Sequence, residues 1–505
     1  MSSAPRNPIH GRRSKMKKSI LGMISMLVIF SFVCGQTAFA DEAQLMTMLQ
    51  QMQKQMGDLQ NTVVAQKAEI QALKTKGPSI QMAPGGVEAP VMSEEDFTKQ
   101  FDKNLKGKIG ESDKWIKGLK FKGDLRLRYE AFSNKGNSSD TAERDDRNRF
   151  RFRLRYGFEK KFNDDFKVGF RMATGSTSDP TSTNQTMTAD FGFKTINIDQ
   201  AYATYTPNWA NVGPISGAEV TAGKFKNPFE QGSSDLVWDR DVTPEGIYEK
   251  FDFKLLKTDN FDLGGYFTAG QFVLQENSSS NATTSDANLF AFQLGLEPSL
   301  QTSLSEKPIK LKSAVSFYGY DNYANDNNWR GWGTTGVTNR GNPVVPGDIT
   351  ELAARQFQLL EAYNELKFNV KGVPVSPFVD WVTNLGNHAN QYTVPGTNDS
   401  HAWSLGIKLG KLDKKGSWET SYAYKYLGRN SVTGFADSDF NGDDAHVGKR
   451  GSVIKAGYGL TDYLTLNAAA FFVQNLNDPY TTATALNQVY KLDQKRFQLD
   501  LSWKF

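Results

Sequence analysis

The sequence contains little cysteine and histidine, and this excludes several kinds of chemistry. One of the 505 residues is a cysteine and four are histidines. Cys34 lies in an N-terminal segment that we expect to be cleaved, so the mature chain would have no disulfide, no zinc–thiolate site and no thiol nucleophile. No HExxH, GxSxG, P-loop or CxxCH motif is present. The sequence therefore predicts no enzyme activity, no bound metal and no cofactor.

Residues 1–40 have the three parts of an export signal. An apolar core, Ile20–Val33, follows a basic start, and Ala38, Phe39 and Ala40 form a small-x-small cleavage pattern. The basic residues are Arg6, Arg12, Arg13, Lys15, Lys17 and Lys18. The alternative is a single-pass anchor, but an apolar core of about fourteen residues is short for a bilayer. Met16 could also be the true start, because a complete signal follows it.

Cleavage of this segment changes the charge balance and leaves no long apolar run. The whole chain has a net charge of +4, and loss of the six basic residues lowers it to −2, so no nucleic-acid partner is expected. No later run approaches the roughly eighteen apolar residues of a membrane helix. The chain is 38% hydrophobic and 23% charged, yet contains 34 Phe, 18 Tyr and 44 Gly. This composition fits a membrane β-barrel or a large secreted β-protein.

Residues 41–76 are predicted to form a short α-helical coiled coil. Apolar residues recur at alternating spacings of three and four, which keeps one seam facing a partner helix. The seam consists of Leu45, Leu49, Met52, Met56, Leu59, Val63, Gln66, Ile70 and Leu73. Gln66 is its one polar residue, of the kind that fixes register and oligomeric state. The alternative is a lone amphipathic helix on another surface.

Residues 77–118 are predicted to be a linker that contains a second short helix. Gly77 and Pro78 end the coiled coil. Ser93 has the character of an N-cap, and acidic residues follow it in the first turn, where the helix dipole favours negative charge. We interpret this helix either as packing beneath a barrel or as a simple tether.

From residue 119 to residue 505 the apolar period changes to two, which predicts β-strands with one wet and one apolar face. Strict alternation extends over nine or ten residues in Phe121–Ala131, in Arg147–Phe158 and at the C-terminus. Strands of a β-sandwich usually have about five or six residues, whereas a tilted membrane strand needs about 9–11. We expect sixteen strands, beginning near residues 119, 147, 166, 195, 217, 246, 261, 289, 309, 356, 374, 402, 417, 452, 464 and 496.

The connections between these strands alternate between short and long, which is typical of an outer-membrane barrel with short periplasmic turns and long external loops. An even strand number places both ends of the barrel on the periplasmic side, and with them the coiled coil. Sixteen strands leave an open channel, whereas eight are filled by side chains. The longest connection, Tyr320–Arg355, is the candidate for a loop that constricts this channel. The fold class is therefore an all-β, transmembrane, antiparallel barrel of about sixteen strands.

The barrel region resembles the bacterial outer-membrane putative-porin family. The resemblance rests on the opening Gly123–Tyr129, the second strand with its alternating arginines, the strand segment Asp199–Tyr202 and the terminal Phe505. It covers residues 119–505. It implies a porin-like barrel with no catalytic residues, an N-terminal coiled coil and assembly as a homotrimer. Phe505 is similar to the C-terminal signal that the barrel-insertion machinery recognises.

An arginine ladder is the main candidate for a functional surface. By alternation, eight arginines should lie on the inner face of the first three strands, and Asp124 and Glu130 should lie among them. The arginines are Arg126, Arg128, Arg147, Arg149, Arg151, Arg153, Arg155 and Arg171. Guanidinium groups remain charged and bind carboxylates or phosphates in a planar fork. Three readings stay open: a salt-bridge lattice that includes Glu143, Asp145 and Asp146, a pore with a mixed field, and an anion-selective pore.

Two further groups of residues carry weaker hypotheses. Asp437–Asp444 resembles the first half of a calcium loop, but Gly448 stands where the bidentate glutamate would be, and the composition also suits an exposed loop. Aromatic residues near strand ends are typical of the girdles at a membrane surface. They are Trp381, Trp403, Trp418, Tyr422, Tyr424 and Trp503.

The sequence thus favours passive diffusion of small hydrophilic solutes or ions through an outer-membrane channel. The alternatives are a barrel that sheathes a partner, such as an electron-transfer protein, and a surface adhesion module. A barrel enzyme is a further alternative, but its nucleophile and base would have to be close together, and His388, His401 and His446 are scattered over expected loops. The expected surroundings are a lipid bilayer with lipopolysaccharide.

Overall fold

The structure, a computed structural model, describes residues 118–137, 146–177, 179–277, 285–323, 357–386, 400–428, 431–441, 447–476 and 491–505. All of them belong to the larger of two compact units of the chain, Asn104–Phe505. The expected signal peptide and coiled coil, and the linker up to residue 117, lie outside the described residues and stay predictions. In the described part of the chain, no helix has the length and apolarity required to cross a membrane.

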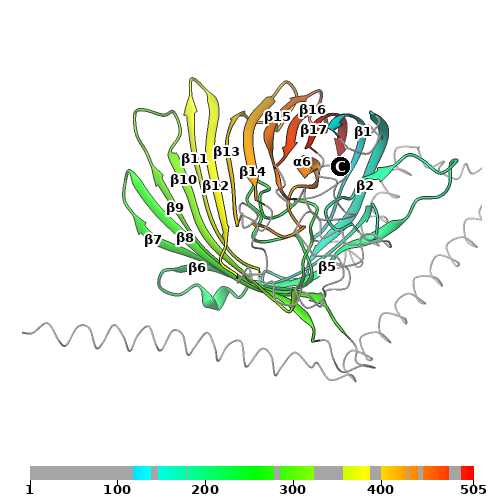
Figure 1. The fold of residues 1–505 in the computed structure, drawn as a ribbon. Helices are drawn as coiled ribbons and strands as arrows, with labels where there is room; N and C mark the ends of the chain where they lie inside the picture. The colour runs from blue at the N-terminus through cyan, green and yellow to red at the C-terminus, as the bar shows by residue number, and fades with distance from the viewer. Residues whose placement is uncertain are drawn as a thin grey trace, which may run out of the picture. The chain divides into compact units, whose positions relative to one another are not determined.

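The described chain is almost entirely β-structure (Figure 1). Two short helical turns, η1 (Asn208–Ala210) and α6 (Ser438–Asn441), interrupt its connections. The strands are β1 Leu119–Asn137, β2 Arg147–Lys161, β3 Phe166–Thr174, β4 Gln185–Thr186, β5 Ile196–Tyr205, β6 Ile215–Lys224, β7 Glu245–Lys257, β8 Phe261–Gln275, β9 Ala287–Leu300, β10 Ile309–Asp321, β11 Gln358–Val370, β12 Val373–Asn384, β13 His401–Gly410, β14 Trp418–Leu427, β15 Lys449–Gly459, β16 Leu464–Asn475 and β17 Lys491–Lys504.

Sixteen of these strands form a closed antiparallel barrel, which confirms the expected fold class. Each pairs with its neighbours in the chain, and β1 closes the ring by pairing with β17 from Asp124↔Lys504 to Asn137↔Lys491. The backbones of Gly123 and Phe505 complete this seam with two hydrogen bonds of 2.8 and 3.1 Å. Because the ring is closed, the barrel has no edge strand along its full length.

The strand starts agree with those expected from alternation to within five residues. The largest difference is at β17, which begins at Lys491 rather than residue 496, because pairing with β1 extends it into a polar segment without alternation. The small strand β4 was not expected. The strand β3 pairs with β2 only from Arg155 onwards, so the N-terminal part of β2, before Arg155, has a free edge on that side. There β4 pairs with Arg151 and Phe152.

Short turns join the strands at one rim of the barrel and long loops join them at the other, which we call the turn rim and the loop rim (Figure 1). The tightest turn contains only Lys371 and Gly372, between β11 and β12. Their φ angles are +48° and +78°, as in the turns whose twist matches that of a hairpin. Glycine adopts such an angle without strain, which explains its presence here.

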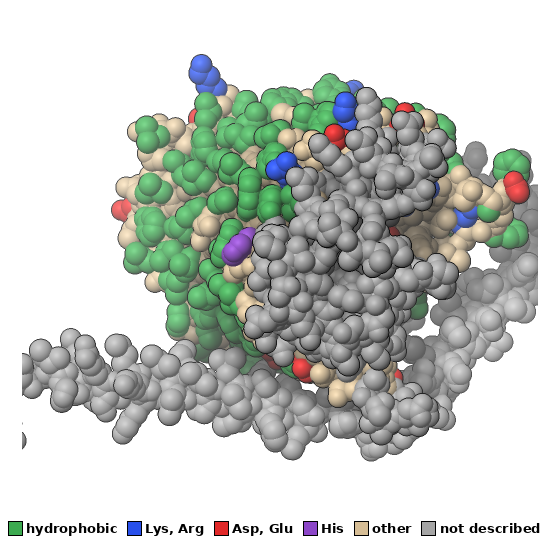
Figure 2. Space-filling model, in the orientation of Figure 1, with side chains coloured by type: hydrophobic (Ala, Val, Ile, Leu, Met, Phe, Trp, Pro, Cys, Tyr) green, Lys and Arg blue, Asp and Glu red, His purple; other side chains and the backbone are tan. Residues whose placement is uncertain are grey.

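The outer face of the barrel is apolar. In β9, Phe290, Phe292 and Leu294 are exposed, while Leu289 and Ala291, which alternate with them, are buried. Hydrophobic side chains cover most of the wall that is visible in Figure 2. Exposed aromatic residues occur toward both rims, with Trp381 opposite Trp403 near the loop rim and Trp418 near the turn rim. This surface fits a hydrocarbon layer with aromatic girdles at its edges.

The hydrophobic core lies inside the barrel and is built by two loops that fold inward from the loop rim. We call residues 225–244 inner loop A and the described residues 428, 431–441 and 447–448 inner loop B. Trp238 of inner loop A contacts Tyr318 on β10 and Phe435 of inner loop B, with ring centroids 5.6 and 5.8 Å apart. Phe229 contacts Tyr318 and Phe272. These loops therefore fill one side of the interior, against β8 to β16.

The loop expected to constrict the channel, Tyr320–Arg355, lies outside the described residues beyond Tyr323. Its role as the constriction therefore stays a prediction. Among the described residues, inner loop A occupies part of the interior. It contains Phe225, Phe229, Leu236, Val237 and Trp238, which are at most 4% exposed. A loop with this composition buries its side chains because they would otherwise face water.

Candidate pore and arginine wall

The inner face of β1, β2 and β17 carries six of the expected arginines together with Arg496, and we call these seven residues the arginine wall. Its members are Arg126, Arg128, Arg149, Arg151, Arg153, Arg155 and Arg496. The register places Arg126 opposite Arg153 and Arg128 opposite Arg151. Like charges directly opposite one another are destabilising, so this arrangement requires carboxylates between the guanidinium groups.

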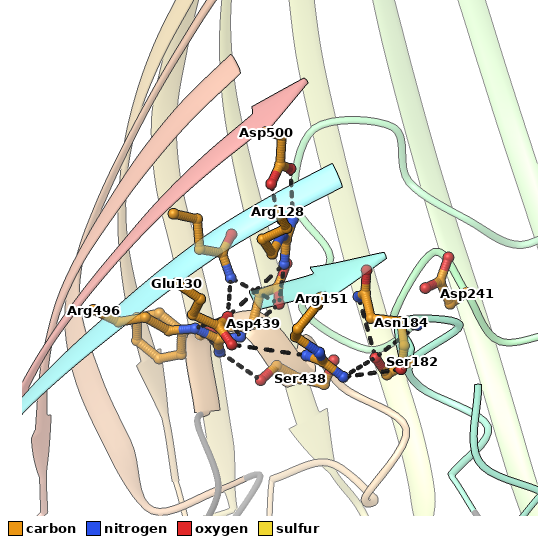
Figure 3. Close-up of polar contacts among 12 residues, drawn as sticks. Arg128, Glu130, Arg151, Ser182, Asn184, Asp241, Ser438, Asp439, Arg496 and Asp500 are labelled. Carbon is orange, nitrogen blue, oxygen red and sulfur yellow. Dashed lines mark hydrogen bonds and ion pairs between the residues drawn. The ribbon is translucent and has the colours of Figure 1, made fainter. Parts of the chain in front are cut away.

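Glu130 on β1 supplies the most central of these carboxylates. Its side chain is fully buried and lies beside Arg496 (Figure 3), and it also contacts Arg149 and Gln498. It accepts hydrogen bonds from Nε of Arg149, from Nε of Arg496 at 2.8 Å and from Nε2 of Gln498 at 2.8 Å. A terminal nitrogen of Arg151 is 3.8 Å away. Arg128 is 4.0 Å away, so four guanidinium groups lie within 4.0 Å of this one carboxylate.

Arg128 is held by two acidic residues from distant parts of the chain. It forms a two-point fork with Asp500 of β17, with N–O distances of 2.7 and 2.8 Å. It also contacts Asp439 of α6 at 3.2 Å, and Asp439 accepts a hydrogen bond of 2.9 Å from Arg496. Charge-assisted forks of this kind are short and fix the orientation of both side chains. Asp439 therefore fastens inner loop B to the arginine wall.

Arg153 and Arg155 share Asp124 of β1 and Asp241 of inner loop A. Asp124 accepts hydrogen bonds of 2.9 and 2.7 Å from their Nε atoms. Asp241 lies 3.9 Å from Arg153 and 3.5 Å from Arg155. Inner loop A thus reaches the wall on the same inner face as inner loop B. Arg126 has a more distant acid, Asp500 at 3.7 Å, and donates a hydrogen bond to the side chain of Asn184.

The contacts of the wall form a lattice of ion pairs with a positive excess. Its seven guanidinium groups lie among five carboxylates, those of Asp124, Glu130, Asp241, Asp439 and Asp500, which leaves two positive charges in excess. Most members of the wall are largely buried by one another and by the inner loops. Whether the wall selects anions stays a prediction.

The remaining residues of the expected ladder lie elsewhere. Arg147 is exposed at the start of β2, toward the loop rim. Arg171 on β3 pairs with Asp199 on β5 at 2.5 Å, away from the central lattice. Of the acids expected to pair with the ladder, Glu143 and Asp145 lie outside the described residues, and Asp146 is exposed just before β2.

Sequence reasoning missed four residues that complete the lattice: Asp241, Asp439, Arg496 and Asp500. Arg496 and Asp500 alternate inward on the last strand, and closure of the barrel places that strand beside β1, so they could have been found. Asp439 belongs to the segment that resembled half a calcium loop. Asp437 in that segment contacts Lys425 at 2.7 Å, so both carboxylates face cationic side chains.

The two inner loops and residues 175–195 are joined by side chains that bond to backbone. Asp239 of inner loop A accepts a hydrogen bond of 2.9 Å from the backbone N–H of Ser438, and its own N–H donates to the carbonyl of Phe435. Asp241 accepts hydrogen bonds from both the N–H and the hydroxyl of Thr183, at 3.0 and 2.8 Å. Three loops are therefore fixed to one another in front of the arginine wall.

The carboxyl groups of these loops have perturbed pKa values. Burial raises the pKa of Asp241, but Arg153, Arg155 and Arg126 outweigh it and lower the pKa to about 2. Burial likewise opposes Arg128 and Arg496, yet they hold the pKa of Asp439 well below its usual value. The pKa of Asp239 is raised well above the usual value by burial and by the charges of Asp241 and Asp437.

The raised pKa of Asp239 predicts that docking of the inner loops strengthens on acidification. A carboxyl group whose pKa is higher in the folded state binds its proton more tightly there, so the docked state gains stability as pH falls through the raised pKa and loses it as pH rises. The expected result is slower hydrogen exchange at the N–H of Ser438 at pH 5 than at pH 8, after correction for the intrinsic rate. Asp239→Asn should remove this dependence.

An internal reference is available for this measurement. The N–H of Thr183 is bonded to Asp241, whose pKa of about 2 keeps it charged over the same range. Its corrected exchange rate should therefore not follow the titration of Asp239. Equal protection of Ser438 at both pH values in the wild-type protein would contradict the expectation.

A cavity of about 470 Å³ lies between the wall and the inner loops. It extends along the barrel from Asn184 to Leu412 and Ser502 near the turn rim. Eight basic residues line it, namely Arg126, Arg128, Arg153, Arg155, Arg240, Lys408, Lys425 and Lys455. Seven acidic residues also line it, namely Asp235, Asp239, Asp241, Glu419, Asp437, Asp439 and Asp500. The lining is thus strongly charged and nearly balanced, and it suits hydrated polar solutes.

Comparison with known proteins gives one family and several similar structures. The model of a family described as "Putative porin" matches residues 132–346 and 348–505. Solved structures that resemble the chain include Pseudomonas putida OprB, with 12% identity, a TM-score of 0.44, and coverage of 77% of this chain and 95% of that one. Salmonella typhi OmpF, in a complex with daunomycin, has 11% identity and a TM-score of 0.39, with coverage of 77% and 99%. Vibrio cholerae OmpT has 10% identity and a TM-score of 0.37, with coverage of 77% and 100%. No curated protein matches the sequence.

Proposed function

Because the chain belongs to the putative-porin family, as the resemblance of its sequence indicated, we propose that it forms a water-filled channel in the outer membrane for passive diffusion of small hydrophilic solutes and ions. One observation carries the proposal: a closed barrel with an apolar outer face encloses a cavity lined by charged residues. A lipid-facing exterior and a hydrated interior are the two requirements of such a channel.

The size and charge of the cavity define the solutes that we propose. At about 30 Å³ per molecule, roughly fifteen waters fill 470 Å³, so the space suits solutes of a few to about a dozen heavy atoms. The lining charges nearly cancel, because Asp241, Asp439 and Asp500 lie directly against the arginines, while other basic and acidic residues line the rest of the cavity. Closely spaced charges of both signs suit dipolar solutes and leave only the small positive excess of the wall to favour anions.

The alternative roles receive less support from the arrangement of the interior. A barrel that sheathes a threaded partner needs an open bore, and inner loops A and B fill one side of this one. The family and the fold point to a channel rather than to an enzyme. An adhesion role would depend on the long loops, much of which lies outside the described residues.

A narrowing substitution tests the channel. Asn467 lies on β16 in the lining of the cavity, whereas the preceding residue, Leu466, is exposed on the outer face and does not line the cavity. In a planar bilayer, the purified protein should give stepwise conductance, and Asn467→Trp should lower each step by about half or more because indole fills part of the cavity. Leu466→Trp is the matched control and should conduct as the wild type does. Folded protein that inserts without any conductance would overturn the proposal.

The assembly and placement of the chain extend this proposal. The heptads of residues 41–76 support a homotrimer with its coiled coil in the periplasm. Phe505 lies at the turn rim with 61% of its side chain exposed, where the barrel-insertion machinery could bind it before the barrel closes. Lipopolysaccharide would surround the loop rim, and lipid the apolar wall.

A further inference from the structure

Two carboxylates are buried inside the barrel, away from the arginine wall. Glu361 on β11 is 1% exposed and Asp380 on β12 is 0% exposed. Among the described residues, neither forms an ion pair with a basic side chain. The nearby lysines are engaged elsewhere: Lys425 binds Asp437 at 2.7 Å, and Lys312 lies over the ring of Tyr363 at 5.6 Å. The two negative charges are therefore not balanced by a direct contact.

The strand register places the two carboxylates close together. Asp380 pairs with Tyr363, which is two residues from Glu361 on the same face of β11. Such diagonal neighbours have backbones about 7–8 Å apart, within reach of both side chains. Glu361 accepts hydrogen bonds of 2.8 Å from Ser316 and from Tyr318. Both oxygens of Asp380 lack a hydrogen-bond partner, which is costly for a buried charged group.

Neutral polar side chains without partners surround the same position. Ser404 is the register partner of Asp380 on β13, and Ser234 and Gln231 of inner loop A lie beside Asp380 and Glu361, respectively. These three residues are at most 4% exposed. The hydroxyls of Ser234 and Ser404 and both amide atoms of Gln231 form no hydrogen bond of normal length and angle, although Ser234 and Gln231 approach the two carboxylates. Buried polar atoms are rarely left unpaired, so a group of them around two carboxylates points to a ligand.

We propose that Glu361, Asp380, Ser234, Ser404 and Gln231 bind a calcium ion. Apart from the amide nitrogen of Gln231, all the side-chain atoms that could ligate a metal are oxygens, as a hard cation requires. The two positive charges of the ion would balance the two carboxylates. Calcium accepts six to eight oxygens at about 2.3–2.6 Å in irregular geometry, which suits a site shared by a loop and three strands. Magnesium demands a stricter octahedron, and zinc prefers nitrogen and sulfur ligands. The described residues contain no group of three or more acidic, histidine or cysteine side chains suited to a metal, so this site depends on its neutral oxygens.

The ion has a route to the site and a structural role there. Ser234 and Lys425 line the 470 Å³ cavity, so the site lies directly behind the cavity wall. Ser234 and Gln231 belong to inner loop A, whereas Glu361, Asp380 and Ser404 belong to the barrel. Calcium would therefore pin inner loop A to β11, β12 and β13, on the side opposite to the contact of Asp241 with the arginine wall.

Direct binding and thermal stability of the full chain test the proposal. The protein is refolded in detergent without lipopolysaccharide, which itself binds calcium, and is then stripped with a chelator. Equilibrium dialysis with radioactive calcium should give one tightly bound ion per chain, and calcium should raise the temperature at which the barrel unfolds. Asp380→Asn should bind calcium at least tenfold more weakly and lose the thermal shift. Asp413→Asn, in an exposed turn, is the matched control and should behave as the wild type does.

Two results would overturn the calcium site. One is a wild-type protein that binds no calcium beyond the level of Asp380→Asn. The other is a wild-type protein whose unfolding temperature ignores calcium but rises on acidification, while that of Asp380→Asn does not, because a proton rather than a metal would then neutralise the pair. Both variants are first checked for the gel mobility of a folded barrel, so that loss of binding is not loss of fold. The test does not measure conductance, so a failure of the calcium proposal would leave the proposed channel unaffected.

Discussion

Replacing Glu130 by glutamine is expected to lower the free energy of unfolding of the barrel by about 3–5 kcal/mol, the range for removing one partner from a buried ion pair. Glu130 is fully buried, and its carboxylate contacts Arg149, Arg151 and Arg496. Glutamine keeps the shape and one acceptor oxygen, but it removes the charge and turns an N–H₂ group toward guanidinium donors. Three buried cations then share fewer carboxylates, and their repulsion adds to the cost of desolvation.

The measurement is unfolding by denaturant in lipid vesicles, followed by tryptophan fluorescence. Glu419→Gln is the matched control, because Glu419 also pairs with a basic residue of a neighbouring strand, Lys408, at 2.9 Å, but both side chains are about one third exposed. A partly exposed pair contributes at most about 1 kcal/mol. If both variants lost the same free energy of unfolding, burial would not determine how much the ion pairs of the lattice contribute to stability.

The barrel could be predicted from the sequence because its physical cause is local. A strand with one face in lipid and one in water must alternate, and Arg147–Phe158 does so over its whole length. Where alternation is absent, the prediction was less accurate, as at Lys491–Lys495, which is a strand only because β1 extends beside it. Membership of a strand there depends on a partner far away in the sequence.

The arginine wall could be predicted only in part. Alternation placed Arg126 and Arg153 on one face. The loops that neutralise these arginines show no regular alternation, so the sequence does not predict where their acidic residues lie. Asp241 and Asp439 reach the wall because apolar residues near them, such as Trp238 and Phe440, are buried in the interior. Apolar residues within a loop are a signal for inward folding, and inner loop A contains them.

The wall and the inner loops depend on one another electrostatically. The register of β1 and β2 sets arginine against arginine, and the barrel alone supplies Asp124, Glu130 and Asp500 as counter-charges. Inner loops A and B add Asp241 and Asp439. Docking of the loops therefore both narrows the interior and reduces its positive charge, so one structural feature influences the size and the charge of the proposed solutes.

Neutralising the two loop carboxylates is consequently expected to make the proposed channel clearly anion-selective. In the double variant Asp241→Asn and Asp439→Asn, the seven guanidinium groups of the wall keep three carboxylates instead of five, so the positive excess rises from two charges to four. Asparagine preserves the size of each side chain and a hydrogen-bond acceptor for Thr183. We expect the ratio of chloride to potassium permeability to increase several-fold over the wild type.

The reversal potential under a salt gradient measures this ratio, at about 0.1 M salt, where the Debye length of about 10 Å leaves charges within the cavity partly unscreened. The effect should shrink toward 1 M salt, at which that length falls to about 3 Å. Asp413→Asn removes a carboxylate from an exposed turn outside the cavity and should leave the ratio unchanged. A shift toward potassium in the double variant, or no shift at low salt, would mean that permeating ions do not pass the arginine wall.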